Sequence, residues 1–239
     1  TNVTALIAES VHHSLDCADC HQGVSPDQFD RNTLESLGDK RQAVQCGDCH
    51  EKEVAAYHEL GHALVGHFLP GTDPIHKISL VSRGSALGYT WSLPDQDRRL
   101  ITKSKFEDEI AQALGGREAE KLVFGETSTG AENDLRKATK IAHDMVRVYG
   151  MSDKLGPIQY GHREEMVFLG RDFGDGQKYS EKIAAELDDE VRAIILRAGK
   201  VAGTMLRKHH KLLDKISKIL IIKETIDRDD FAKLVGATI

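Results

Sequence analysis

The pentapeptide His58-Glu59-Leu60-Gly61-His62 constrains this chain more than any other stretch. Two histidines four positions apart lie on the same face of an α-helix, so both imidazoles can bind one zinc ion. The glutamate beside the first histidine can polarise a metal-bound water. The pattern therefore predicts the core of a zinc hydrolase site, with His58 and His62 as ligands and Glu59 beside the bound water.

The residues around the pentapeptide support this prediction. Residues 54–68 are apolar on nearly every side of a helix, which predicts that the helix is buried. Imidazole and carboxylate groups buried there would be costly without partners, and a metal ion supplies one. His67 lies five positions after His62 and off the ligand face, so we expect an ordinary, partly buried histidine. The pattern also arises by chance in unrelated helices and does not establish a metal site alone.

The composition of the 239-residue chain changes near position 50. All four cysteines lie before it, and residues 1–50 carry eight acidic and three basic side chains, a net charge of −5 out of −6 for the chain. We therefore expect a small segment of residues 1–50 and one sizeable domain of residues 51–239. The acidic balance argues against nucleic acid as a partner. Because the chain begins at Thr1 without a signal peptide, we expect a fragment or a processed form.

The first segment contains the pattern Cys-x-x-Cys-His twice. The two copies are Cys17-Ala18-Asp19-Cys20-His21 and Cys46-Gly47-Asp48-Cys49-His50. This pattern is the attachment signature of c-type haem, in which two thiols form thioethers and the histidine binds iron. His12 and His13 lie just upstream and are candidates for distal iron ligands. The segment resembles small multihaem c-type cytochromes, which implies two haem groups.

Other interpretations of the cysteines stay open. Cys17, Cys20, Cys46 and Cys49 can together bind one structural zinc ion, although the 25 residues between the pairs exceed the usual spacing. A thioredoxin-like redox pair is disfavoured because no βαβ pattern surrounds either motif, and disulfides require an oxidising compartment. Residues 22–45 are polar, so we expect little structure there unless a cofactor holds the segment together.

Hydrophobic periodicity predicts a mainly α fold after residue 50, with a small β-hairpin. The metal helix is expected to end at Pro70-Gly71, and strands 75–81 and 87–93 to flank a turn at Arg83-Gly84. Further helices are predicted over 105–123, 135–149, 179–196, 201–222 and 227–234, the last with Thr225 as its cap. Glycines and charges predict a surface loop over 161–178.

Five motifs resemble the peptidase domain of FtsH-type ATP-dependent membrane zinc metalloproteases. They are Ala56–Val65 around the pentapeptide, Ser82–Thr90, Leu114–Glu120, Thr129–Leu135 and Tyr149–Ser152, and the likeness covers residues 51–239. It implies a helical zinc metallopeptidase domain in which Asp134 is the third zinc ligand after His58 and His62. Glu59 would be the general base, and Glu120 would accept a hydrogen bond from a ligand histidine. Without the resemblance, the sequence predicts only that Asp134 caps a helix. The resemblance also makes the Ile78–Tyr89 region an edge strand to which extended substrate adds.

The same resemblance implies partners and a location. It implies unfolded protein or peptide substrates, an ATPase module or subunit, a homo-hexamer, and membrane association with the peptidase on the cytoplasmic side. Covalent haem would instead imply the periplasm. A haem-binding electron-transfer protein and an inactive peptidase fold used for assembly are the alternatives. Asp134 favours zinc, since carboxylates do not suit low-spin haem, and the intact Glu59 argues against an inactive fold.

Overall fold

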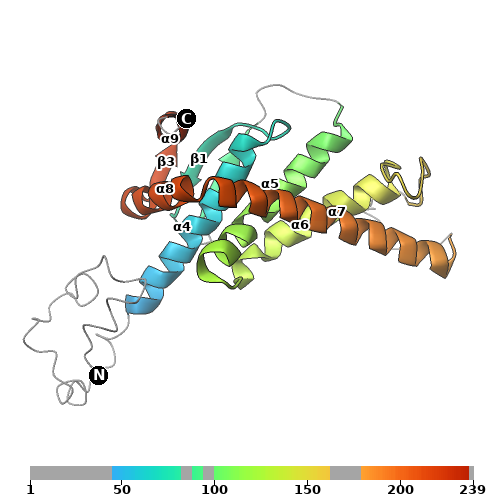
Figure 1. Ribbon diagram of the computed structural model, residues 1–239, viewed down its shortest axis with the longest axis horizontal. Coiled ribbons are helices and arrows are strands. Elements are labelled where there is room, and N and C mark those ends of the chain that lie inside the picture. The colour runs from blue at the N-terminus through green and yellow to red at the C-terminus, as the bar shows by residue number, and fades with distance from the viewer. Residues whose placement is uncertain (1–44, 82–87, 94–99, 162–178, 237–239) are drawn as a thin grey trace, which may run out of the picture. The chain divides into compact units, whose positions relative to one another are not determined.

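The computed structural model describes residues 45–81, 88–93, 100–161 and 179–236 (Figure 1). The chain divides into two units, Thr1–Lys52 and Glu53–Ile239. Of the first unit, only residues 45–52 are described, and they are helical. The first Cys-x-x-Cys-His motif with His12 and His13, the Arg83-Gly84 turn, and most of the predicted loop over 161–178 lie outside the described residues.

The described part is mostly helical with one small sheet, so the predicted fold class is confirmed. The elements are α4 (Gln45–Phe68), β1 (Ile75–Ser79), β2 (Tyr89–Ser92), α5 (Lys103–Phe124), a 3-10 turn (Thr129–Ala131), α6 (Glu132–Arg147), α7 (Glu181–Lys208), α8 (His210–Lys223), β3 (Thr225–Asp227) and α9 (Arg228–Gly236). None of the described helices is long and apolar enough to cross a membrane.

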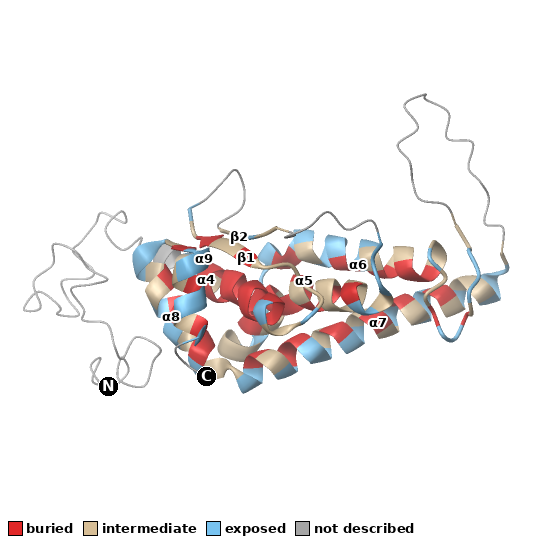
Figure 2. Ribbon diagram, turned by 90° about the horizontal axis from the view of Figure 1, so that it is seen from above, coloured by how far each residue is buried: buried red, intermediate tan, exposed pale blue. Residues whose placement is uncertain are grey.

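The central part of α4 is buried, as the sequence predicts. Every residue from 55 to 66 is buried, as the red ribbon of this helix in Figure 2 shows. His67, which follows, is more exposed than predicted, and its ring contacts Phe68 and Phe231 edge-on. The helix ends at Phe68, just before Pro70-Gly71, and Lys105 fixes the following turn through hydrogen bonds from Nζ to Gly71 O (3.0 Å) and Asp73 Oδ1 (2.9 Å).

Two glycines let the metal helix approach α5 at backbone contact. A Cβ added to Gly115 would lie only 2.6 Å from the main-chain oxygen of Gly61, and no side chain fits there. Helix α5 also packs against α6 and α7, and α6 packs against α7. The close crossing at Gly61 and Gly115 brings the polar residues of α4 within reach of side chains from α5.

The predicted break between the last two long helices is wrong. Residues 197–200 continue α7, which ends instead at Lys208; the backbone leaves helical geometry at the next residue, His209 (φ −110°, ψ 23°). Ala198 is buried, and a Cβ on Gly199 would lie 3.8 Å from Leu114 of α5, an ordinary contact distance. Packing against α5 therefore keeps this glycine-containing segment helical although its local propensity is weak.

The sheet has three strands in the order β2-β1-β3, and both pairs are antiparallel. The predicted hairpin is confirmed as β1 and β2, with Ile78 opposite Thr90, whereas β3 was not predicted. Strand β1, which contains Ile78, lies between β2 and β3. The prediction that the Ile78–Tyr89 region is an edge strand is therefore wrong for β1. Among the described strands, β2 and β3 are the edges.

Two helix starts also differ from the prediction. Thr225 lies in β3 and does not cap α9; Asp227 Oδ1 instead accepts a hydrogen bond from the Asp230 amide at 3.0 Å. Helix α6 begins at Glu132, so Asp134 lies inside its first turn rather than before it. The side chain of Asp134 is therefore available for contacts with other helices.

Candidate metal centre

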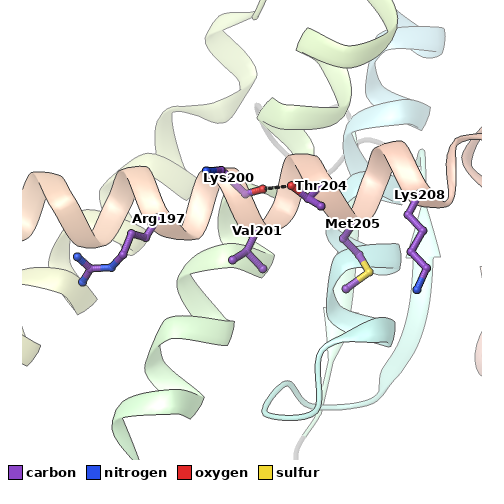
Figure 3. A pocket seen from close by; sticks show the side chains of 6 residues that line it. All are labelled: Arg197, Lys200, Val201, Thr204, Met205 and Lys208. Carbon is purple, nitrogen blue, oxygen red and sulfur yellow. Dashed lines mark hydrogen bonds between the residues drawn. The ribbon is translucent and has the colours of Figure 1, made fainter.

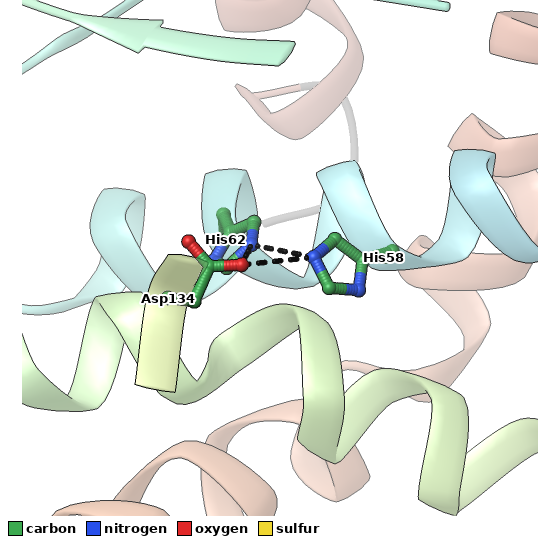
Figure 4. Close-up of side chains that lie close together, drawn as sticks. All are labelled: His58, His62 and Asp134. Carbon is green, nitrogen blue, oxygen red and sulfur yellow. Dashed lines mark hydrogen bonds and ion pairs between the residues drawn. The ribbon is translucent and has the colours of Figure 1, made fainter. Parts of the chain in front are cut away.

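Three potential ligands from two helices converge on one point (Figure 4). His58 and His62 lie one turn apart on α4, and Asp134 comes from the first turn of α6. The two Nε2 atoms lie 3.0 Å apart, and Asp134 Oδ2 lies 3.1 Å from Nε2 of His58 and 3.2 Å from Nε2 of His62. Both histidines are buried, and the aspartate is partly exposed.

The other nitrogen of each imidazole is held by a hydrogen-bond acceptor. Nδ1 of His58 lies 2.6 Å from Glu120 Oε1, and Nδ1 of His62 lies 2.8 Å from the main-chain oxygen of Gln112. A carbonyl oxygen can only accept, so His62 must carry its proton on Nδ1, and the Glu120 carboxylate fixes His58 in the same way. In the neutral imidazoles, both Nε2 lone pairs then face each other and the Asp134 carboxylate.

This set of donors fits a zinc ion. Three lone-pair donors pointing at one another at 3.0–3.2 Å repel unless a cation or a proton lies between them. Zinc binds imidazole nitrogen at about 2.0–2.1 Å and carboxylate oxygen at about 2.0–2.2 Å, which places neighbouring tetrahedral ligands about 3.3–3.5 Å apart. Small side-chain shifts satisfy that spacing, and two imidazoles with one carboxylate leave a fourth position open.

The electrostatics of the metal-free centre also favour a cation. Burial lowers the pKa of His58, but its hydrogen bonds to Asp134 and Glu120 outweigh burial and raise the pKa to about 9. Burial raises the pKa of Asp134, yet hydrogen bonds from His58 and His62 hold it far below its usual range. Burial likewise raises the pKa of Glu120, and its hydrogen bonds with His58 and Ser128 outweigh that effect and lower it. A proton on His58 therefore occupies the place that a metal ion would take.

Several contributors to the centre were not predicted from the sequence. Ser128 donates two hydrogen bonds to the Glu120 carboxylate, from its amide to Oε2 (2.6 Å) and from its hydroxyl to Oε1 (3.0 Å). Gly116 leaves room for the imidazole of His58, because a Cβ there would lie 2.6 Å from that ring. Adjacent glycines inside a helix are unfavourable by about 1 kcal/mol each, so Gly115-Gly116 was the available signal of a close approach.

The predicted base lies beside the ligands and against the sheet. Glu59 is 9% exposed, and its Oε2 accepts a hydrogen bond of 2.6 Å from Thr90 Oγ1 on β2. The side chain is thus held by a strand and not by the metal ligands. This arrangement leaves the carboxylate able to act on a water molecule.

Among the residues whose side chains the structure describes, this centre contains no further predicted metal ligand. Cys46, Cys49 and His50 lie in the first two turns of α4, and the other haem-motif residues lie outside the described part. A separate hollow of about 460 Å³ is lined, among the described residues, by one face of α7 (Figure 3). Its lining residues are Arg197, Lys200, Val201, Thr204, Met205 and Lys208. It contains no metal ligand.

Comparison with known proteins decides the family. The sequence model of peptidase family M41 matches residues 46–234. The chain belongs to peptidase family M41. All residues of the metal centre lie within the match, and so does the second Cys-x-x-Cys-His motif, while the first motif lies before it.

Curated relatives of this M41 chain are zinc metalloproteases by name. It is 51% identical over 185 residues to "ATP-dependent zinc metalloprotease FtsH 1" of Conexibacter woesei, which covers 77% of this chain and 28% of that protein. It is 51% identical over 187 residues to "ATP-dependent zinc metalloprotease FtsH" of Kosmotoga olearia, covering 78% and 29%. The M41 chain thus spans less than a third of these relatives. Neither family nor relatives support the haem assignment, which stays a prediction.

Proposed function

We propose that this chain is a zinc-dependent endopeptidase that cleaves extended or unfolded polypeptide. The observation that carries the proposal is the convergence of Nε2 of His58, Nε2 of His62 and Oδ2 of Asp134 within 3.2 Å, with both Nδ1 atoms already bonded to acceptors. Membership of peptidase family M41 and the names of the relatives support the same activity.

Each residue of the centre has a separate role in the proposed reaction. His58, His62 and Asp134 would hold the metal, and Glu120 would orient His58. The bound zinc ion would supply a Lewis acid that activates water and polarises the scissile carbonyl. Glu59 takes a proton from the attacking water and passes it to the leaving amine, so the peptide bond breaks with no net proton change at the carboxylate.

Substrate would add to strand β2. Edge strands bind extended peptides through main-chain hydrogen bonds, and β2 pairs with β1 on one side only among the described strands. Thr90 of β2 contacts the base, so peptide bound along this edge lies near the reacting groups. Preference for unfolded substrates follows, because a folded protein does not present a free extended segment.

The partners and the location are further parts of the proposal. The relatives' names describe ATP-dependent proteases, which supports an ATPase module or subunit that delivers unfolded substrate. Homo-hexamer assembly and membrane association with the peptidase on the cytoplasmic side follow from the resemblance to FtsH-type enzymes. Haem binding by the two Cys-x-x-Cys-His motifs is a separate prediction that rests on the sequence pattern alone.

The test is hydrolysis of a fluorescently labelled unfolded protein by the zinc-loaded chain. We expect cleavage by the natural chain and a loss of about 100-fold or more in Glu59→Gln, since general acid–base catalysis contributes about 10²–10⁴-fold. Zinc content should stay the same, because Glu59 is not a ligand. Absence of cleavage by the fully zinc-loaded natural chain would favour the inactive assembly fold.

A further inference from the structure

Thr90 of strand β2 reaches across to the predicted base. Its Oγ1 donates to Glu59 Oε2 at 2.6 Å and also lies 2.9 Å from the main-chain oxygen of Glu59. Thr90 pairs with Ile78 of β1, whose side chain is fully buried. Cross-strand partners point to the same face of a sheet, so the Thr90 hydroxyl lies on the face that covers α4.

The backbone before Thr90 also lies directly on the glutamate. A Cβ added to Gly88 would lie 2.9 Å from Cγ and 3.2 Å from Oε1 of Glu59. Only a residue without a side chain fits this position without displacing the carboxylate. The segment 88–90 thus confines Glu59 both by a hydrogen bond and by shape.

We propose that Thr90 is a positioning residue that fixes the Glu59 carboxylate and ties the base to the strand that receives substrate. This inference rests on the proposed peptidase function. Thr90 holds Oε2. We therefore assign the exchange of a proton with the attacking water and the leaving amine to the other carboxylate oxygen, Oε1.

Thr90 has two acceptors within reach on the same residue. A threonine hydroxyl has one proton and donates to one acceptor at a time. The carboxylate Oε2 at 2.6 Å is closer than the main-chain oxygen at 2.9 Å, and charge-assisted hydrogen bonds are the shorter and stronger ones. Both contacts hold the Thr90 hydroxyl against Glu59.

The first test separates turnover from binding in the zinc-loaded full chain. Thr90→Val keeps the shape of the side chain and removes the donor. We expect kcat for unfolded protein to fall about 10–100-fold with little change in KM, because small misplacements of a reacting group cost rates of this order. Thr90→Ser should restore most of kcat. Thr225→Val is the matched control: Thr225 lies in β3, at the opposite edge of the same sheet, and its hydroxyl contacts Ser79 of the central strand, so kcat should not change.

The second test detects the contact without using hydrolysis. In the zinc-saturated full chain, a double-mutant cycle between Thr90→Val and Glu59→Met should show a coupling of about tenfold in the unfolding equilibrium constant. Coupling below about twofold would overturn the inference whatever the activity. An active natural chain with unchanged kcat in Thr90→Val would also overturn it, while leaving the peptidase function standing. If the natural chain cleaved no substrate, the proposed peptidase function itself would be wrong.

Discussion

Replacing Glu120 by glutamine should weaken zinc binding although no ligand is changed. The carboxylate is 2% exposed and accepts hydrogen bonds from Nδ1 of His58, from the Ser128 amide and from the Ser128 hydroxyl. Glutamine has one acceptor and one donor in place of two acceptors. If its NH₂ faces His58, Nδ1 must lose its proton and Nε2 must carry one, which prevents metal binding. If the NH₂ faces Ser128, two donors meet inside the protein.

The size of the effect follows from the bond that is lost. A hydrogen bond to a charged group contributes about 1.5–3 kcal/mol, which corresponds to about 10–150-fold in an equilibrium constant. Loss of the hydrogen-bond acceptor that orients a metal-binding histidine typically lowers metal affinity by about 10–100-fold. We therefore expect the zinc dissociation constant of Glu120→Gln to rise by about 10–100-fold.

Competition with a fluorescent zinc chelator measures this change in the full chain. Glu126→Gln makes the same substitution at an exposed position just beyond α5, and it should bind zinc like the natural chain. If Glu120→Gln kept its zinc dissociation constant within about threefold of the control, well under the expected change, Glu120 would not orient the ligand histidine.

Three further perturbations have expected outcomes. Gly116→Ala should lower zinc occupancy, measured by mass spectrometry, because the new methyl group would lie 2.6 Å from the His58 ring. Zinc can bind only after His58 has lost its proton, and the pKa of His58 in the metal-free chain is about 9. The apparent zinc affinity should therefore rise about tenfold per pH unit and level off near pH 9. By the same linkage, the stabilisation that this proton gives the metal-free chain is complete below pH 6.5 and is lost as the pH rises through about 9. Lys105→Met should reduce the free energy of unfolding by about 1–3 kcal/mol in urea titration, since it leaves the partly buried Asp73 carboxylate and the Gly71 oxygen without their hydrogen-bond donor.

Each of these outcomes has a control or a contrary result. Gly236→Ala, where a Cβ meets nothing within 4 Å, should leave zinc occupancy unchanged. A zinc affinity independent of pH between 6 and 9 would mean that His58 binds no proton in the metal-free chain. A loss below about 0.5 kcal/mol in Lys105→Met, typical of a surface substitution, would show that the buried ion pair does not fix the turn after α4.

The elements with a strong periodic pattern could be predicted from the sequence. Residues 54–68 of α4 are apolar on nearly every side, and residues 55–66 are buried; the alternation around Ile78 and Thr90 gives the β1–β2 pair. The third strand could not be predicted, because Thr225–Asp227 has only three residues and becomes a strand by pairing with β1. Similarly, glycine has a low helix propensity, and Gly199 is helical because α7 packs against α5.

The candidate site was predictable to a different degree for each residue. The i, i+4 spacing places His58 and His62 on one face of a helix, and any helix with this spacing would do so. Asp134 lies 76 residues from His58, and only resemblance to a family connected the two before the fold brought them to 3.1 Å. Thr90 and Ser128 carry no local signal, since a hydroxyl becomes a positioning group only through its neighbours in space.

X-ray absorption at the zinc edge tests the proposed metal centre in a single measurement. One equivalent of zinc is added to the metal-free full chain, and the distances from zinc to its ligands are determined. His58, His62 and Asp134 predict only nitrogen and oxygen ligands at about 2.0–2.2 Å, with the multiple-scattering signal of two imidazoles. Sulfur ligands at about 2.3 Å would contradict this centre and would place the zinc on the cysteines instead.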